Sequence, residues 1–236
     1  MEQWYLYKKK ADFTKIGEKF QIDPVIARLI RNRDVIGDEE IHKYLYGNLS
    51  DISDPFLMKG VREGVDIIRE KIRDRKTIRI ISDYDVDGVV SNYILWKAIY
   101  DLGGMIDFQI PDRMKDGYGI NENIIEKAVE DQIDTILTCD NGIAASEAIR
   151  FGKEHGLTMI ITDHHDVPFI LNEDGSKEEI LPPADVVINP KQKECKYPYP
   201  LLCGAGVAFQ FVRALYKSMG EDENKLEDLL SMLAIA

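Results

Sequence analysis

The 236-residue sequence lacks the marks of several protein classes. It has only three cysteines, Cys139, Cys195 and Cys203, and no C-x-x-C pair. So sparse and odd a set argues against a disulfide framework and indicates a reducing compartment such as the cytoplasm. No apolar run reaches membrane-spanning length, and the first residues do not form a signal peptide. We therefore expect a cytoplasmic protein that does not enter membranes.

Basic charge is also scarce. Thirty Lys and Arg residues stand against 42 Asp and Glu, which gives a net charge of −12. The chain as a whole is therefore not a basic nucleic-acid binder, and any nucleic acid must be held by a local basic groove, by metal ions or by parts outside this sequence. The hydrophobic content of 44% supports a sizeable core. The length suits one large α/β domain plus a small extra piece.

Strands and helices alternate over most of the chain. Apolar runs predict strands at 77–81, 106–110, 135–139, 158–162 and 185–188. Helices are expected near 89–102, 121–130 and 144–155, and again at 206–219 and from 225 onward. This rhythm predicts an α/β fold with a mainly parallel five-stranded sheet and helices on both faces. The polar stretch 169–183 is expected to be an exposed loop.

A small helical segment is predicted before the sheet. Asp23-Pro24 has the N-cap and first-turn proline of a helix start, and a second short helix is expected at 38–46. A long helix at 58–74 then leads to the first strand. We predict two domains, a helical preface at 1–57 and an α/β domain at 58–236.

A cluster of acids follows the strand at 77–81. In Ser82-Asp83-Tyr84-Asp85-Val86-Asp87-Gly88, three carboxylates stand at alternate positions, and the glycine is expected to let the chain turn into the next helix. The carboxyl edge of a parallel sheet is where α/β proteins bind ligands. Three close carboxylates repel one another unless a cation neutralises them. The stretch therefore predicts a divalent-metal site.

Two other interpretations of this stretch exist. The spacing D-x-D-x-D-G also begins an EF-hand calcium loop. That loop needs a glutamate at its twelfth position, where this chain has Ile94, and it needs a helix in front instead of a strand. The simpler alternative is a solvent-exposed acidic turn that binds no metal. The polar ends of two later strands argue against this alternative.

Those two strands end in groups that can bind metal. The strand at 135–139 is followed by Asp140-Asn141-Gly142, and the strand at 158–162 by Asp163-His164-His165. Neighbouring parallel strands lie about 5 Å apart, so their ends can meet at one site. Oxygen and imidazole ligands together suit manganese, zinc or iron better than calcium or magnesium. Two such ions about 4 Å apart could activate water and stabilise an in-line displacement at phosphorus.

Taken together, these segments resemble a known family. The stretch TDHHDVP resembles the signature of the DHH phosphoesterase superfamily. With SDYDVDGVVS, IPDRMKDGYGIN, TCDNGIAA and LCGAGVAFQ in this order, nearly the whole chain is similar to the RecJ family of bacterial single-strand-specific 5′→3′ exonucleases. The resemblance implies a hydrolase of single-stranded DNA, active in recombination and repair. It also implies two manganese ions in the full-length protein, with magnesium as a possible substitute.

The resemblance further implies roles for individual residues. The implied metal ligands are Asp83, Asp85, Asp87, Asp140 and His164. Asp140 would bridge the two ions, and His165 would face the scissile phosphate, so both are expected to be catalytic. Asp83 is included because Ile81 stands where some members of the superfamily carry a histidine.

Three further places are candidates for substrate contacts. The guanidinium of Arg113 suits a phosphate oxygen, the alternative being a surface ion pair with a neighbouring aspartate. Tyr118 could stack on a base or pack against the protein. Gly204 and Gly206 open a helix and could bind phosphate through backbone N–H groups, although the full phosphate-loop pattern is missing.

The resemblance also sets an expectation about length. RecJ-like proteins continue beyond a segment such as LLSMLAIA into a turn with another metal-binding aspartate, and then into a domain that grips the substrate. We therefore expect this chain to be the N-terminal part of a longer protein. By itself it is expected to bind manganese poorly and to show little or no exonuclease activity.

Two other functions stay open at this stage. One is a DHH phosphodiesterase for short oligonucleotides or cyclic dinucleotides, and the other is a non-catalytic replication or repair scaffold. The expected partners are single-stranded DNA and a single-strand-binding protein or a helicase. The sequence does not give the oligomeric state.

Overall fold

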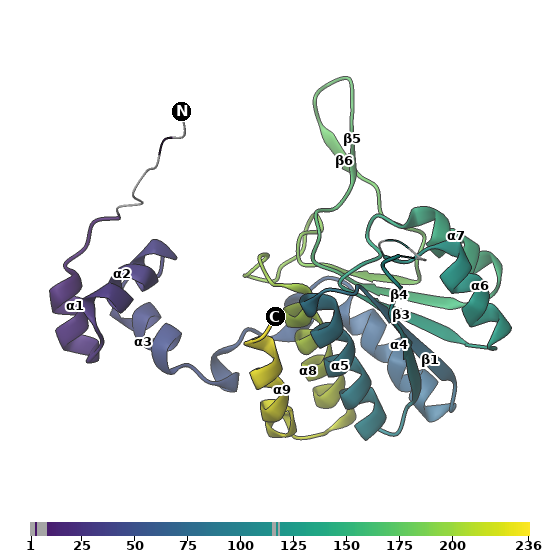
Figure 1. The fold of residues 1–236 in the computed structure, drawn as a ribbon, viewed down its shortest axis with the longest axis horizontal. Coiled ribbons are helices and arrows are strands. Elements are labelled where there is room, and N and C mark those ends of the chain that lie inside the picture. The colour runs from purple at the N-terminus through teal and green to yellow at the C-terminus, as the bar shows by residue number, and fades with distance from the viewer. Residues whose placement is uncertain (1–2, 4–8, 115–116, 118) are drawn as a thin grey trace. The chain divides into compact units, whose positions relative to one another are not determined.

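The structure, a computed structural model, describes residues 3, 9–114, 117 and 119–236. The chain divides into two compact units, one up to Ile52 and one from Ser53 to Ala236. Figure 1 shows the helices of the first unit in purple and blue and the sheet of the second in teal and green. The domain boundary predicted from the sequence, between residues 57 and 58, lies slightly further along the chain.

The first unit is a cluster of three helices: α1 (Phe13–Phe20), α2 (Pro24–Asn32) and α3 (Asp38–Tyr46). The side chains buried between them are Phe20, Ile30 and Ile41. The predictions of α2 and α3 are confirmed, and Asp23 caps α2 by accepting the N–H of Val25. Helix α1 was not predicted, although Phe13, Ile16 and Phe20 recur at helical spacing.

A five-stranded parallel sheet forms the centre of the second unit. Its strands, in spatial order, are β2 (Met105–Gln109), β1 (Thr77–Ser82), β3 (Thr135–Cys139), β4 (Thr158–Thr162) and β7 (Val186–Ile188). The predicted parallel sheet is confirmed. Ser82 pairs with Cys139, and Cys139 pairs with Thr162. The residues that follow β1, β3 and β4 therefore leave the sheet side by side at one edge.

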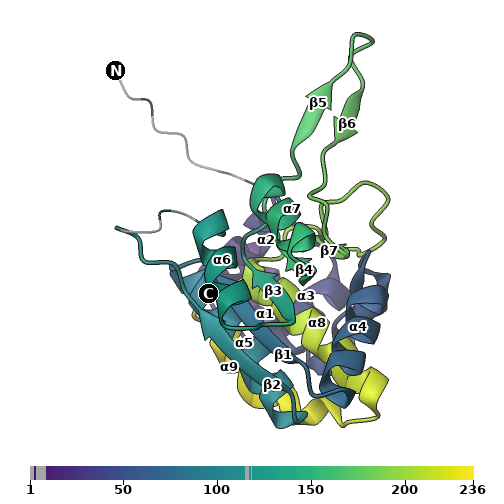
Figure 2. The ribbon, with the colours of Figure 1, turned by 90° about the vertical axis from the view of Figure 1, so that its right-hand side faces the viewer.

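Helices cover both faces of this sheet, as predicted (Figures 1 and 2). Helices α4 (Val61–Arg73), α5 (Val86–Asp101) and α8 (Gly204–Met219) pack on one face, and α6 (Glu122–Glu130) and α7 (Ser146–Glu154) pack on the other. Ile81, Ile136 and Ile161 lie in the core beneath α6 and α7. Ile80 and Leu137, which point to the opposite face, are also fully buried. The central strands β3 and β4 are buried on both faces and are continuous, mainly apolar runs, whereas the edge strand β2 is largely exposed.

Helix α5 begins three residues earlier than predicted. Asp85 is its N-cap and accepts the N–H of Gly88 at 3.0 Å. The expectation that Gly88 turns the chain is wrong, because Gly88 lies inside the first turn of the helix. A Cβ atom added there would sit 2.4 Å from the carbonyl oxygen of Asp83. The glycine instead lets the helix start approach the strand end closely.

Smaller elements complete the second unit. The predicted loop at 169–183 is an exposed antiparallel hairpin of β5 (Phe169–Leu171) and β6 (Lys177–Glu179), which projects from the sheet in Figure 2. The helix predicted from residue 58 begins at Val61. Short 3₁₀ helices are found at Leu49–Asp51, at Pro55–Leu57 before α4, and at Glu223–Leu226 before the last helix. Helix α9 (Glu227–Leu233) is the last element. Within the described ranges, every helix is too short or too polar to span a membrane.

Candidate metal centre

The side chains that follow β1, β3 and β4 meet at the shared sheet edge. Ligand atoms of Asp83, Asp85 and Asp140 lie within 4.8 Å of one another, and so do those of Asp140, His164 and His165. Asp140 belongs to both groups. Two adjoining sets of ligands that share one carboxylate suit a pair of neighbouring cations with a bridging ligand.

Asp140 occupies a costly position. Its side chain is only 2% exposed, so a negative charge there is buried. Its backbone has a φ of 59°, in the left-handed region that aspartate and asparagine tolerate better than most other residues. Burial raises the pKa of Asp140 to about 6 against the opposing hydrogen bond from His164, and the nearby carboxylate of Asp87 adds to the rise. A cation would relieve this unfavourable burial of negative charge.

His164 presents one ring nitrogen to the acidic cluster. Its Nδ1 lies 3.0 Å from the carbonyl oxygen of Leu202. Because a carbonyl only accepts hydrogen bonds, Nδ1 carries the proton, and Nε2 of the neutral ring has a free lone pair. That atom faces Oδ1 of Asp140 at 3.0 Å and Oδ2 of Asp87 at 3.5 Å.

Three electron-rich atoms pointing at one another need a proton or a cation between them. In the metal-free protein a proton on His164 can take this place, since the hydrogen bond to Asp140 raises the pKa of His164. The backbone carbonyl that fixes the tautomer of His164 is the usual second partner of a metal-binding histidine. The residues present therefore fit a divalent metal such as manganese.

Asp87 is held by a helix from far along the chain. Its two carboxylate oxygens accept the N–H groups of Gly204 and Ala205, each at 2.7 Å, at the start of α8. The N–H of Gly206 points to the Cys203 sulfur at 3.3 Å. These N–H groups already have partners within the protein, so the geometry gives no support to the prediction that Gly204 and Gly206 bind phosphate.

Arg113 and Tyr118 are the other two predicted substrate contacts. The guanidinium of Arg113 lies over the ring of Tyr84, 5.5 Å from its centroid. Tyr84 stands between Asp83 and Asp85, so Arg113 is on the same edge as the metal ligands. Tyr118 lies outside the described residues.

Asp163 was missed by the sequence prediction of site residues, although it is part of the triplet that was singled out. Its side chain is 1% exposed and lies 2.8 Å from Nδ1 of His165. This hydrogen bond raises the pKa of His165. Burial would raise the pKa of Asp163, but hydrogen bonds from His165 and the N–H of Ile143 outweigh it and lower that pKa. Asp163 is therefore an ionised partner of His165.

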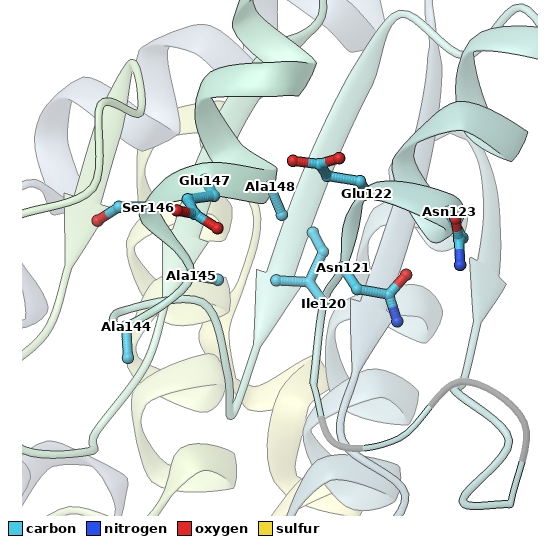
Figure 3. Close-up of a pocket in the computed structure, with 9 residues that line it drawn as sticks. All are labelled: Ile120, Asn121, Glu122, Asn123, Ala144, Ala145, Ser146, Glu147 and Ala148. Carbon is cyan, nitrogen blue, oxygen red and sulfur yellow. The ribbon is translucent and has the colours of Figure 1, made fainter.

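A pocket of about 680 Å³ opens between the first turns of α6 and α7 (Figure 3). Its walls are Ile120–Asn123 on one side and Ala144–Ala148 on the other, the latter beginning four residues after Asp140. Glu122 and Glu147 stand in the two first turns. The two glutamates place negative charge at the helix N-termini that line the pocket.

Comparison with known proteins gives consistent matches. Residues 77–236 match the DHH family, N-terminal domain. The chain is 37% identical over 235 residues to the single-stranded-DNA-specific exonuclease RecJ of Bacillus subtilis, covering 99% of this chain and 28% of that protein. It is 31% identical over 228 residues to the RecJ of Haemophilus influenzae, covering 93% and 37%. The expected similarity to RecJ proteins is confirmed.

Solved structures agree with these sequence matches. A crystal structure of exonuclease RecJ bound to manganese has 30% identity and a TM-score of 0.62, covering 75% of this chain and 42% of that one. RecJ from Thermus thermophilus in complex with Mn²⁺ has 25% identity and a TM-score of 0.63, covering 94% and 29%. The chain spans about a third of the length of the curated relatives described above.

Proposed function

The chain belongs to the DHH family, and from this premise we propose that it is the catalytic N-terminal domain of a metal-dependent exonuclease. The proposed reaction is hydrolysis of phosphodiester bonds in single-stranded DNA with 5′→3′ polarity, in recombination and repair. The observation that carries the proposal is the position of Asp140 in both ligand groups of the candidate metal centre. The RecJ relatives, which are named as single-stranded-DNA-specific exonucleases, give the substrate class.

The proposed ligands divide into two sets around Asp140. Asp83 and Asp85 would hold one Mn²⁺, and His164 with Asp87 would hold the other, Mg²⁺ being the alternative ion. When bound, the ions supply the charge that activates water and stabilises the phosphate oxygens in the transition state. The carbonyl of Leu202 keeps Nε2 of His164 available as a ligand.

His165 and Arg113 are proposed to bind the scissile phosphate. Since Nδ1 of His165 is engaged by Asp163, its Nε2 is the atom that would donate to a phosphate oxygen. The raised pKa of His165 favours the protonated ring, which is the better donor to an anion. Arg113 would add a second positive group beside Tyr84.

The proposal also covers the cellular location of the protein and its partners. The three cysteines Cys139, Cys195 and Cys203 are free thiols, which supports a reducing cytoplasm. Single-stranded DNA is the proposed partner, with a single-strand-binding protein or a helicase as proposed protein partners.

A nuclease assay tests the proposed function. The 236-residue chain and the full product of its gene are incubated with Mn²⁺ and end-labelled DNA, single-stranded and double-stranded, and with a dinucleotide and a cyclic dinucleotide. We expect the full gene product to degrade single strands from the 5′ end. Cleavage of the dinucleotides alone would instead show a short-substrate phosphodiesterase. Binding of DNA without cleavage of any substrate would show a scaffold.

Metal binding should depend on pH in a defined direction. Protons compete with Mn²⁺ for Nε2 of His164, whose pKa is raised, and for Asp140, whose pKa is about 6. Affinity is therefore expected to rise from about pH 5.5 to about pH 8, with release of protons on binding. Calorimetric titration in two buffers of different ionisation enthalpy measures both quantities. His155→Gln is the control and should leave the pH dependence unchanged. His155 lies at the C-terminal end of α7, whereas the loop that contains Asp140 leads into the N-terminal end. An affinity independent of pH would contradict the assigned ligands.

A further inference from the structure

A buried carboxylate outside the two ligand groups connects two strand ends. Asp163 accepts the N–H groups of His164 at 2.7 Å and His165 at 3.1 Å through Oδ1, which also lies 2.8 Å from Nδ1 of His165. Its Oδ2 accepts the N–H of Ile143 at 2.9 Å. Both oxygens of Asp163 are therefore hydrogen-bonded within the protein.

The bond to Ile143 ties together segments that carry different site residues. Ile143 is in the loop that begins with Asp140 after β3, whereas Asp163 follows β4. Oδ2 thus holds the β3 loop and Oδ1 holds the two histidines. The Asp163 side chain therefore adds to the backbone bond from the Asp140 N–H to the Thr162 carbonyl in tying the loop of Asp140 to His165, and catalytic geometry is sensitive to displacements between such segments.

A second buried side chain holds the other side of His165. Asn189, directly after β7, is 0% exposed and donates from Nδ2 to the carbonyl oxygen of His165 at 2.9 Å. Its Oδ1 accepts the N–H of Lys191 at 2.8 Å. His165 is consequently fixed at its backbone N–H, its backbone carbonyl and its ring by residues from two adjacent strand ends.

We propose that Asp163 is the positioning residue for His165, with Asn189 in support. Asp163 accepts the Nδ1–H of His165 and holds the ring plane, so that Nε2, which carries a second proton in the protonated ring, faces the scissile phosphate. The inference rests on the proposed function of His165. Asp163 does not touch the substrate, and its effect on hydrolysis passes through the imidazole. Loss of a carboxylate that orients a catalytic histidine reduces turnover by roughly 10²-fold to 10⁴-fold in other enzymes.

The test begins with the tautomer of the histidine in the metal-free 236-residue chain. ¹⁵N NMR of the imidazole nitrogens, at a pH where the ring is neutral, should show His165 with its proton on Nδ1. In Asp163→Ala, which has no side-chain acceptor for the Nδ1 proton, this preference should disappear, whereas the amide oxygen of Asp163→Asn could still accept that proton. The matched control is Asp166→Asn, because Asp166 lies three residues further on, is 94% exposed and pairs with Lys191 instead of His165. Asp166→Asn should leave the tautomer unchanged.

Kinetics of the full gene product complete the test. Asp163→Asn is expected to lower kcat by on the order of 10²-fold or more, with KM and Mn²⁺ affinity changed by less than about threefold. A wild-type spectrum that shows the proton of the neutral His165 ring on Nε2 would overturn the inference. This outcome needs no variant, so the test holds even if Asp163 variants do not fold. Equal loss of Mn²⁺ binding and turnover would also overturn it, because Asp163 would then act on the metal ligands.

The two readouts separate this inference from the proposed function. The tautomer measurement needs no turnover and decides the positioning role even for a protein that cleaves nothing. Absence of hydrolysis in the wild-type gene product would count against the proposed function alone.

Discussion

Asp140→Asn is expected to lower the nuclease activity of the full gene product by at least about 10³-fold, because it removes the carboxylate shared by the two ligand groups. Asparagine is the substitution of choice, since it keeps the side-chain shape and tolerates the φ of 59° at this position. Turnover is measured on labelled single-stranded DNA with saturating Mn²⁺. Near wild-type turnover would show that the bridging role is misassigned.

The same substitution should stabilise the metal-free chain. The pKa of Asp140 is about 6 in the fold against an ordinary value of 3.8. The folded state therefore binds this proton more tightly, and stability is lost as the pH rises from the ordinary value through the raised one. The difference corresponds to about 3 kcal/mol at pH values above both, which is an upper estimate for the gain in Asp140→Asn.

Urea unfolding of the metal-free chain measures this gain. At about pH 8, Asp140→Asn should have the higher free energy of unfolding, and the difference should shrink toward zero below about pH 4, where aspartate is protonated in both states. Asp66→Asn, on the exposed side of α4, is the control and should show no comparable change with pH. A variant less stable than the wild type at the higher pH would contradict the burial cost assigned to Asp140.

Gly204→Ala should damage both stability and activity. The Cβ atom of alanine at this position would lie 2.6 Å from Oδ1 and 2.7 Å from Cβ of Asp140. Helix α8 must then move away from the strand end, which weakens the bond from the Gly204 N–H to Asp87. We expect a loss of about 1–3 kcal/mol in unfolding free energy and roughly 10²-fold in turnover, because Asp87 and Asp140 both shift.

Gly206→Ala is the matched comparison on the same helix turn. A Cβ atom there would meet Cδ2 of Leu202 at 3.2 Å and the Cys203 sulfur at 3.7 Å, and both are side-chain atoms that can move. Its loss in stability should be clearly smaller. Equal stability of the Gly204→Ala and Gly206→Ala variants in urea unfolding would contradict the close approach of α8 to Asp140.

Local features of the sequence were enough to predict the sheet. Strands β3 and β4 lie at the predicted residues, because strands buried on both faces are continuous apolar runs bounded by polar residues. The common edge of the acidic segments followed from the parallel arrangement alone. The start of α5 was predicted three residues late, because Gly88 has the composition of a turn but serves a close helix–strand contact that the local sequence does not reveal.

The sequence by itself determined which residue types stand at the ends of β1, β3 and β4, and hence that metal ligands gather at one edge. Only the tertiary structure decided how each is held. Asp87 receives two N–H groups from α8, more than 100 residues away, and Asp163 accepts the N–H of Ile143 from the neighbouring loop. Such partners depend on strand order and helix packing. Hydrogen bonds between distant segments form only once the hydrophobic core brings the segments together, so no local pattern records them.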